Sequence, residues 1–148
     1  MPVLAENRKA FHDYEILDTL EAGIVLLGHE VKAVRDGHVS LKGAYAILRN
    51  GECELLNAHI SPYQKAGPLP SYDPTRTRKL LLHTKELYRM AEKLKKDRLT
   101  LVPLRVYTRG RRIKVALGIV RGKKQYEKRD QLKQRDVHRE LQRSLKSY

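Results

Sequence analysis

Basic side chains interleaved with tyrosines are the feature of this sequence best suited to chemistry. Arginine and lysine bind phosphates, while a tyrosine ring offers a face on which a nucleic-acid base can stack. A single basic run is as often just a solvated surface, but three such runs in one short chain favour an RNA partner. The runs are Arg76-Thr-Arg78-Lys79, Arg105-Val-Tyr107 and Lys123-Lys124-Gln-Tyr126-Glu-Lys128-Arg129.

The overall charge of the chain points the same way. Its 148 residues include 31 Lys and Arg against 17 Asp and Glu, which gives a formal net charge of +14. Such a charge favours polyanions, because binding releases counterions from phosphates. An anionic membrane is the second candidate partner after nucleic acid. It is less favoured because no apolar run approaches the roughly 20 residues that a spanning helix needs and the first residues lack a signal-peptide pattern. We therefore expect a cytoplasmic protein that does not bind membranes.

Catalysis and metal binding have no positive support in the sequence. The six histidines show no spacing that would bring two ligands to one metal, and the single cysteine, Cys53, lies in an alternating apolar run typical of a buried thiol. We expect no catalytic residues, no metal and no cofactor. An RNA-processing enzyme stays open as an alternative, with an acid and a base far apart in sequence, such as His12 or His83 with Glu30.

The pattern of apolar residues predicts a mainly β protein. Residues 11–20 and 23–28 have the composition of two strands, and residues 30–35 suit a short helix. Residues 44–48 and 53–58 flank Asn50-Gly51, a strong hairpin signal. Asp73-Pro74 predicts a helix start, with apolar positions at helical spacing from Thr84 onward. Residues 99–107 and 113–120 form a last predicted hairpin, in which Pro103 favours an edge or a bulge.

Six strands with a helix before the last hairpin suit a small closed β-barrel of the oligonucleotide-binding type, flanked by helices. We assign residues 1–120 to this barrel and residues 121–148 to a basic tail. The tail holds ten Lys or Arg and four acidic residues, so it has too few apolar residues to form a core. Its apolar residues are nevertheless spaced four, four and three residues apart, as on one face of a helix. We therefore predict a segment that is disordered or conditionally helical. These residues are Val137, Leu141, Leu145 and Tyr148.

Several stretches of the chain together resemble the bacterial SmpB family of tmRNA-binding proteins. The resemblance runs from about Asn7 into the tail, and its order and spacing make it highly specific. The matching stretches are Asn7-Arg8-Lys9-Ala10-Phe11-His12-Asp13-Tyr14, Glu21-Ala22-Gly23-Ile24, Gly28-His29-Glu30-Val31-Lys32, Asp73-Pro74-Thr75-Arg76-Thr77-Arg78-Lys79-Leu80-Leu81-Leu82 and Gly122-Lys123-Lys124-Gln125-Tyr126-Glu127-Lys128-Arg129.

The resemblance implies a non-catalytic adaptor. It would bind the tRNA-like domain of tmRNA and deliver it to ribosomes stalled on messages without a stop codon, the process called trans-translation. The tail would enter the decoding centre and the empty mRNA channel of the small subunit. Elongation factor Tu and alanyl-tRNA synthetase are implied as indirect partners, and we expect a monomer.

The resemblance also implies specific site residues. The positions matching those on the family's tmRNA-binding surface are Asn7, Glu21, Leu81 and Lys114, to which we add the neighbouring Arg8, Lys9, Lys32 and Arg35. Asn and Glu suit base edges or the 2′-hydroxyl, while Lys anchors phosphate. In the tail, the residues expected to contact the ribosome are Lys123, Lys124, Tyr126, Lys128, Arg129, Lys133, Arg135 and His138.

Two positions depart from the family pattern. Glu127 stands where the family usually has Asp, which keeps the charge but lengthens its reach, and Ala33 replaces a common Ser, which removes a hydroxyl. A general ribosomal or tRNA-binding protein with the same barrel and tail is the main alternative. Preference for tmRNA over bulk tRNA at matched salt separates the two, because phosphate contacts alone favour neither RNA.

Overall fold

The computed structural model describes residues 2–96 and 99–122. Helices are interspersed among the strands along the chain. They are β1 (Val3–Glu6), α1 (Arg8–Asp13), β2 (Tyr14–Ile24), α2 (Gly28–Arg35), β3 (Val39–Ser40), β4 (Tyr45–Arg49), β5 (Glu52–Leu56), β6 (His59–Ile60), the 3₁₀ turn η1 (Gln64–Ala66), β7 (Arg78–Leu81), α3 (Thr84–Lys96), β8 (Thr100–Arg109) and β9 (Arg112–Gly122).

Six of the strands pair in a closed ring, so the mainly β, oligonucleotide-binding type of barrel is confirmed. The order of antiparallel pairing is β2, β9, β8, β4, β5 and β7, and β7 then pairs with β2 again. A closed ring leaves no long unpaired edge at which another chain could add a strand. Strand β1 extends the edge of β8 near Tyr107, while β4 pairs with the other half of β8 at Leu101.

The interior of the ring is the main core of the protein. Alternate residues of β8 and β9 point inward, and Val115, Leu117 and Ile119 have no exposed surface. Gly118 points away from this core, and a Cβ there would lie 2.9 Å from Leu104 Cδ1, so a larger residue would displace the Leu104 side chain. The predicted irregularity at Pro103 is confirmed, because the pairing of β8 with β9 shifts between Pro103 and Arg105.

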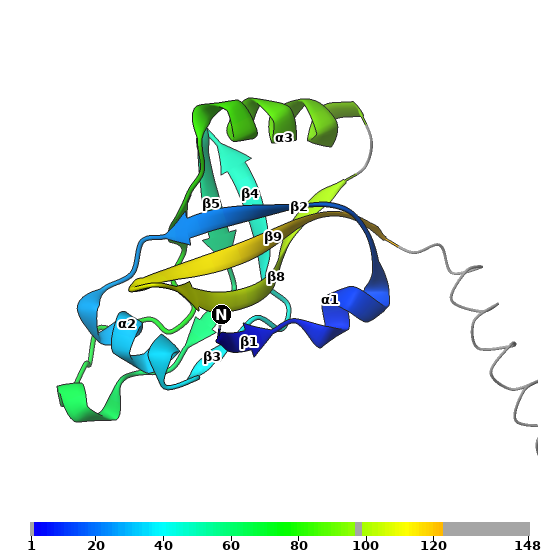
Figure 1. Ribbon diagram of the computed structural model, residues 1–148. Helices are drawn as coiled ribbons and strands as arrows, with labels where there is room; N and C mark the ends of the chain where they lie inside the picture. The colour runs from blue at the N-terminus through cyan, green and yellow to red at the C-terminus, as the bar shows by residue number, and fades with distance from the viewer. Residues whose placement is uncertain (1, 97–98, 123–148) are drawn as a thin grey trace, which may run out of the picture.

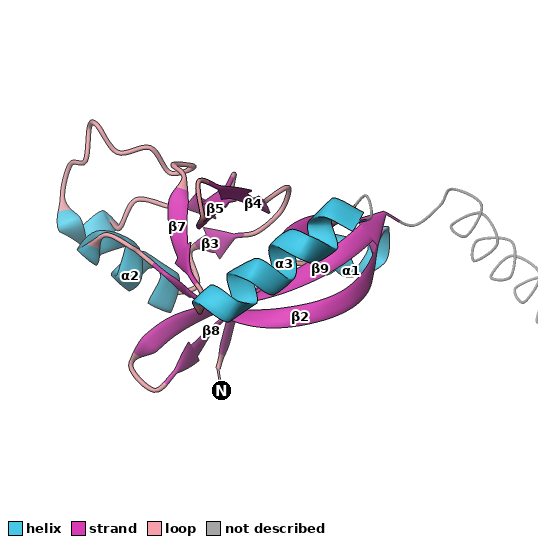
Figure 2. Ribbon diagram, turned by 90° about the horizontal axis from the view of Figure 1, so that it is seen from above, coloured by secondary structure: helices cyan, strands magenta, loops and turns pink. Residues whose placement is uncertain are grey.

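The helices lie at separate places around the barrel (Figures 1 and 2). Helix α3 lies across one end and inserts Met90 into the core. Helix α1 covers a second apolar cluster, formed by Ala10 with Leu104 and Val120. Helix α2 and the long loop after β6 lie on the side opposite to α1.

Several local predictions are confirmed. Strands β4 and β5 form the predicted hairpin, and its turn residues Asn50 and Gly51 have positive φ angles of 52° and 75°, as a two-residue hairpin turn requires. Helix α2 and the last hairpin also form where they were predicted. Cys53 is buried at 1% exposure, and burial raises the pKa of its thiol to about 11.

Other predictions are wrong. The two strands predicted at 11–20 and 23–28 are one strand, β2, which begins after α1 and ends at Ile24. No helix begins at Asp73-Pro74: Asp73 Oδ1 accepts hydrogen bonds from the Thr75 backbone and hydroxyl, and its carbonyl accepts from the Arg76 amide, which makes a single turn. The chain then enters β7, and the helix starts only at Thr84. Strand β9 runs from Arg112 to Gly122, two residues past the predicted end of this strand at residue 120.

Candidate nucleic-acid interface

Four neighbouring strands bring one row of side chains together on the outside of the barrel. Gly23 of β2 pairs with Leu81 of β7 on one side and with Lys114 of β9 on the other, and Lys114 pairs with Tyr107 of β8. Directly opposed residues of paired strands share one face, and Glu21 shares it because it lies two residues before Gly23. The structure therefore brings together three of the predicted site residues, Glu21, Leu81 and Lys114.

Gly23 has no side chain, so the surface of the barrel is hollowed at its position in this row. A Cβ at this position would lie 3.3 Å from Leu81 Cβ and 3.8 Å from Lys114 Nζ. A side chain here would therefore crowd Leu81 and cover the space between the two residues. The absence of a side chain opens the hollow that Glu21, Leu81 and Lys114 line.

Glu21 is held in place by residues that the sequence did not reveal as its partners. The Tyr107 hydroxyl donates to Glu21 Oε2 at 2.5 Å, and Arg109 Nη1 donates to Oε1 at 2.9 Å. The pKa of Glu21 is lowered chiefly by the Tyr107 hydrogen bond, then by the hydrogen bond and charge of Arg109 and by the charge of Lys114. Glu21 is therefore an ionised acceptor with a fixed orientation.

This row combines three ways of holding RNA. The Glu21 carboxylate can accept hydrogen bonds from a base edge or a 2′-hydroxyl, and the Lys114 ammonium can pair with a phosphate. Leu81, exposed at 52%, offers an apolar surface to a base or sugar. Arg112 lines the same hollow and adds a cation that the prediction did not include.

Arg35 joins this region from α2. Its Nη2 atom donates to the carbonyl oxygen of Arg111 at 2.7 Å, which places the guanidinium beside the turn of the β8–β9 hairpin. Lys32 lies on another face of α2, where its Nζ is 5.8 Å from the centre of the Tyr63 ring. The structure therefore brings Arg35, but not Lys32, to the Glu21 side of the helix.

Asn7, Arg8 and Lys9 line a different groove, next to Lys42. Asn7 is buried, and its Nδ2 donates to the Pro103 carbonyl at 2.9 Å and to the Leu41 carbonyl at 3.4 Å. Its Oδ1 accepts from the Ala10 amide at 3.2 Å and caps α1. This geometry favours an indirect role, in which Asn7 fixes the helix that presents the exposed Arg8 and Lys9.

The run Arg76-Thr-Arg78-Lys79 is not the phosphate-binding surface that its composition suggested. Arg78 is completely buried, and its Nη2 and Nε donate to Glu30 Oε2 at 2.6 and 2.9 Å. Arg76 pairs with the same carboxylate, and Lys79 Nζ lies 3.1 Å from Glu52 Oε1. The arginines of this run therefore hold the fold together.

Glu30 is the centre of this internal network. It is fully buried, and the Tyr72 hydroxyl donates to its Oε2 at 2.8 Å. Burial raises the pKa of Glu30, but hydrogen bonds from Arg76, the Leu27 amide, Arg78 and Tyr72 outweigh burial and lower the pKa to about 2. Its proton affinity is far too low for a general base near neutral pH, which removes Glu30 from the alternative of an RNA-processing enzyme.

The other tyrosines are divided between packing and polar roles. Tyr14 packs against the cluster under α1, whereas Tyr45 is exposed at 37%. In the run Arg105-Val-Tyr107, Arg105 lies 5.1 Å from the centre of the Phe11 ring, and Tyr107 donates to Glu21. The tail residues Lys123, Lys124, Tyr126, Lys128, Arg129, Lys133, Arg135 and His138 lie outside the described residues.

The part of the chain that the structure describes offers no further site of two common kinds. Within it, no three His, Cys, Asp or Glu side chains are grouped so that they could hold a metal ion. None of its helices has the length and apolar character needed to cross a membrane.

Comparison with known proteins identifies the family. The SmpB protein family model matches residues 4–147. An SsrA-binding protein of Enterococcus faecalis is 50% identical over 145 residues, covering 98% of this chain and 94% of the relative. One of Thermosynechococcus vestitus is 51% identical over 144 residues, covering 97% and 95%.

A solved structure agrees with these relatives. A chain from a structure described as "tmRNA-SmpB: a journey to the center of the bacterial ribosome" is 52% identical, with a TM-score of 0.69. The match covers 84% of this chain and 86% of that one. The fold, the row of side chains around Glu21 and the nearly full-length matches agree, and the chain belongs to the SmpB family.

Proposed function

We propose that this protein binds the tRNA-like domain of tmRNA and delivers it to ribosomes stalled on messages that lack a stop codon. The observation that carries this proposal is the row of Glu21, Leu81 and Lys114, which neighbouring strands place side by side on the outside of the barrel. Relatives of about half identical sequence are SsrA-binding proteins, and the related solved structure concerns tmRNA and SmpB in the ribosome.

The geometry supports specific rather than purely electrostatic binding. Phosphate contacts from lysine and arginine provide affinity but carry no sequence information. Glu21 has the opposite charge to these groups, so its place among Arg109, Arg112 and Lys114 has no value for holding phosphate. An ionised carboxylate in fixed orientation instead selects for donors on a base or ribose, which is the contact that discriminates one folded RNA from another.

The barrel and the tail divide the work in this proposal. The barrel recognises tmRNA, while the basic residues of 123–148 contact the small-subunit decoding centre and the empty mRNA channel. The protein acts as a monomeric, cytoplasmic, non-catalytic adaptor. Elongation factor Tu and alanyl-tRNA synthetase take part indirectly, by acting on the tmRNA that this protein holds.

Truncation of the tail tests this division. Deleting residues 121–148 leaves affinity for the tRNA-like domain nearly unchanged and abolishes tagging of nascent chains on stalled ribosomes. A second truncation after Gly122 is the matched control, because it keeps β9 complete, including Arg121, which pairs with Glu15 at 2.6 Å. An equal loss of binding and tagging in the control truncation contradicts the division of labour.

A further inference from the structure

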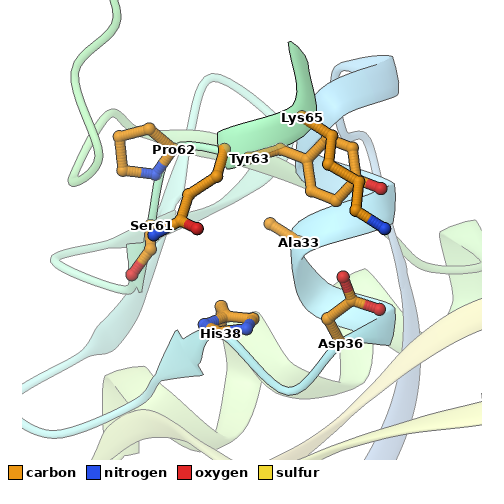
Figure 3. Close-up of a pocket in the computed structure, with 8 residues that line it drawn as sticks. Ala33, Asp36, His38, Ser61, Pro62, Tyr63 and Lys65 are labelled. Carbon is orange, nitrogen blue, oxygen red and sulfur yellow. The ribbon is translucent and has the colours of Figure 1, made fainter. Parts of the chain in front are cut away.

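A hollow of about 230 Å³ lies between α2 and the loop after β6, away from the row around Glu21 (Figure 3). Tyr63 and Lys65 of the loop lie on one side of it, and Asp36 and His38, which follow α2, lie on the other. Its volume is below the roughly 300–1,000 Å³ typical of sites for drug-sized ligands. A single flat ring system is the kind of group that suits a hollow of this size.

Four polar side chains of this hollow have no partner within the described part of the protein. The side chains of Asp36, His38, Gln64 and Lys65 make no hydrogen bond or ion pair to any described residue. The neighbouring Glu30 has four side-chain or backbone partners only a short distance along α2. The polar groups beneath the loop are therefore satisfied inside the protein, whereas those of the hollow are exposed to solvent and accessible to a ligand.

The walls of the hollow are held in position before any ligand binds. The Ser61 amide donates to the His38 carbonyl at 3.1 Å, and the Ile60 amide donates to the Pro74 carbonyl at 3.0 Å. Buried Arg78 ties the far end of the loop to Glu30 and to the carbonyl of Pro74. A pre-formed site avoids part of the entropy cost of binding.

The chemistry of the hollow matches an RNA base. Tyr63 provides an aromatic ring, and the Lys32 ammonium, 5.8 Å from the ring centre, adds a cation that can pair with the phosphate of a nucleotide. Asp36 offers an acceptor of the kind that pairs with exocyclic amino groups of bases. Unstacked bases that lie on aromatic side chains and use their Watson–Crick edges are the usual targets of sequence-specific RNA recognition.

We infer that this hollow is a second RNA subsite, which takes one unstacked base with its ring against Tyr63 and an amino group toward Asp36. The inference rests on the proposed function only in taking RNA as the partner. The base can come from the tRNA-like domain of tmRNA or from ribosomal RNA of the small subunit. In this subsite, Lys32 would pair with the phosphate of the bound nucleotide, although it lies away from the row around Glu21.

Asp36→Asn is the decisive variant. RNA is a polyanion, so loss of a negative charge strengthens binding if the hollow contributes only through charge. A base that donates to the carboxylate instead binds more weakly to Asn, by about fivefold, because the neutral amide oxygen is a weaker acceptor than the carboxylate. The two outcomes have opposite signs, and Asp36 is exposed, so the substitution leaves the fold intact.

Tyr63→Leu gives the second readout. Leucine keeps apolar contact with the core but removes the aromatic face, and loss of base stacking weakens binding roughly tenfold. Tyr45→Leu is the matched control, because Tyr45 is an exposed tyrosine of β4 that does not line this hollow. Urea unfolding of each variant verifies that it is folded.

Binding of the full chain is measured with two probes, the isolated tRNA-like domain and purified small ribosomal subunits. Weaker binding of both Asp36→Asn and Tyr63→Leu to one probe supports the subsite and identifies the source of the base. Wild-type binding of both folded variants to both probes overturns the inference, as does tighter binding of Asp36→Asn. The wild-type preference for tmRNA over tRNA, measured in the same titrations, tests the proposed function separately.

Discussion

Glu30 and Glu21 have the same kinds of partner in opposite surroundings. Each accepts a hydrogen bond from a tyrosine hydroxyl and pairs with arginine, Glu30 with Tyr72 and Arg78, and Glu21 with Tyr107 and Arg109. The side chain of Glu30 has no exposed surface, whereas that of Glu21 is 33% exposed. Burial, rather than residue type, therefore separates a network that stabilises the fold from one that is open to a ligand.

The two networks also differ in how many of their charged groups are free to bind a ligand. Around Glu30, the guanidinium of Arg78 reaches the Ala58 and Pro74 carbonyls as well as the carboxylate, so its donors are used inside the protein. Around Glu21, the neighbouring Lys114 and Arg112 line an open hollow. The first network is closed inside the protein, and the second is open to a ligand.

Removing an arginine from each network gives the largest expected difference. Arg78→Met leaves the buried Glu30 with less compensation and two carbonyls without a donor, and we expect it to reduce the free energy of unfolding by about 3–5 kcal/mol. Arg109→Met, at a pair whose arginine side chain is 64% exposed, is expected to cost less than about 1 kcal/mol. Urea unfolding measures both. Similar losses at the two sites contradict the contrast.

Acid titration sharpens the contrast at Glu30. Its pKa in the folded protein is about 2, below the ordinary value of 4.5. A lowered folded pKa contributes stability that is fully present above pH 4.5 and is lost as the pH falls toward 2. Glu30→Gln, which cannot ionise, is therefore expected to be less stable than wild type by on the order of 2 kcal/mol at pH 7. This gap in unfolding free energy shrinks below pH 4.5, and a constant gap from pH 7 to pH 3 argues against the assigned charge state.

Removing one hydroxyl from the open network has the smallest expected effect. Tyr107→Phe deletes the donor to Glu21 and frees the carboxylate to reorient, so we expect a loss of tmRNA preference of about fivefold, equivalent to roughly 1 kcal/mol. Binding competition measures it, with Tyr45→Phe as the control. Unchanged preference shows that Arg109 alone orients Glu21.

Local patterns in the sequence predicted the elements whose causes are local. Asn50-Gly51 fixes a hairpin turn within four residues, and the alternation of β8 and β9 follows directly from which residues are buried. Asp73-Pro74 has an equally local signature, but the turn there leads into β7, which pairs with the distant strands β5 and β2 instead of starting a helix. Strand β7 has only four residues, which is too short for a clear alternating pattern.

The candidate site residues were predicted through family resemblance, whereas the contacts among them became visible only in the folded structure. Gly23, Leu81 and Lys114 are far apart in sequence and meet only because β2 lies between β7 and β9. Arg78 looked like a phosphate-binding residue because its partner, Glu30, is 48 positions away. The pairing of Tyr107 with Glu21 likewise spans 86 positions. No spacing rule for a single helix or strand reaches over such separations.

The most direct test of the central claim is a salt-titrated competition between the tRNA-like domain of tmRNA and ordinary tRNA. Wild type, Glu21→Ala and Lys114→Ala are compared in parallel. We expect wild type to prefer tmRNA, Glu21→Ala to lose that preference, and Lys114→Ala to bind more weakly with a salt slope reduced by about one. Equal binding of both RNAs by wild type contradicts the claim and leaves a general RNA-binding protein of translation.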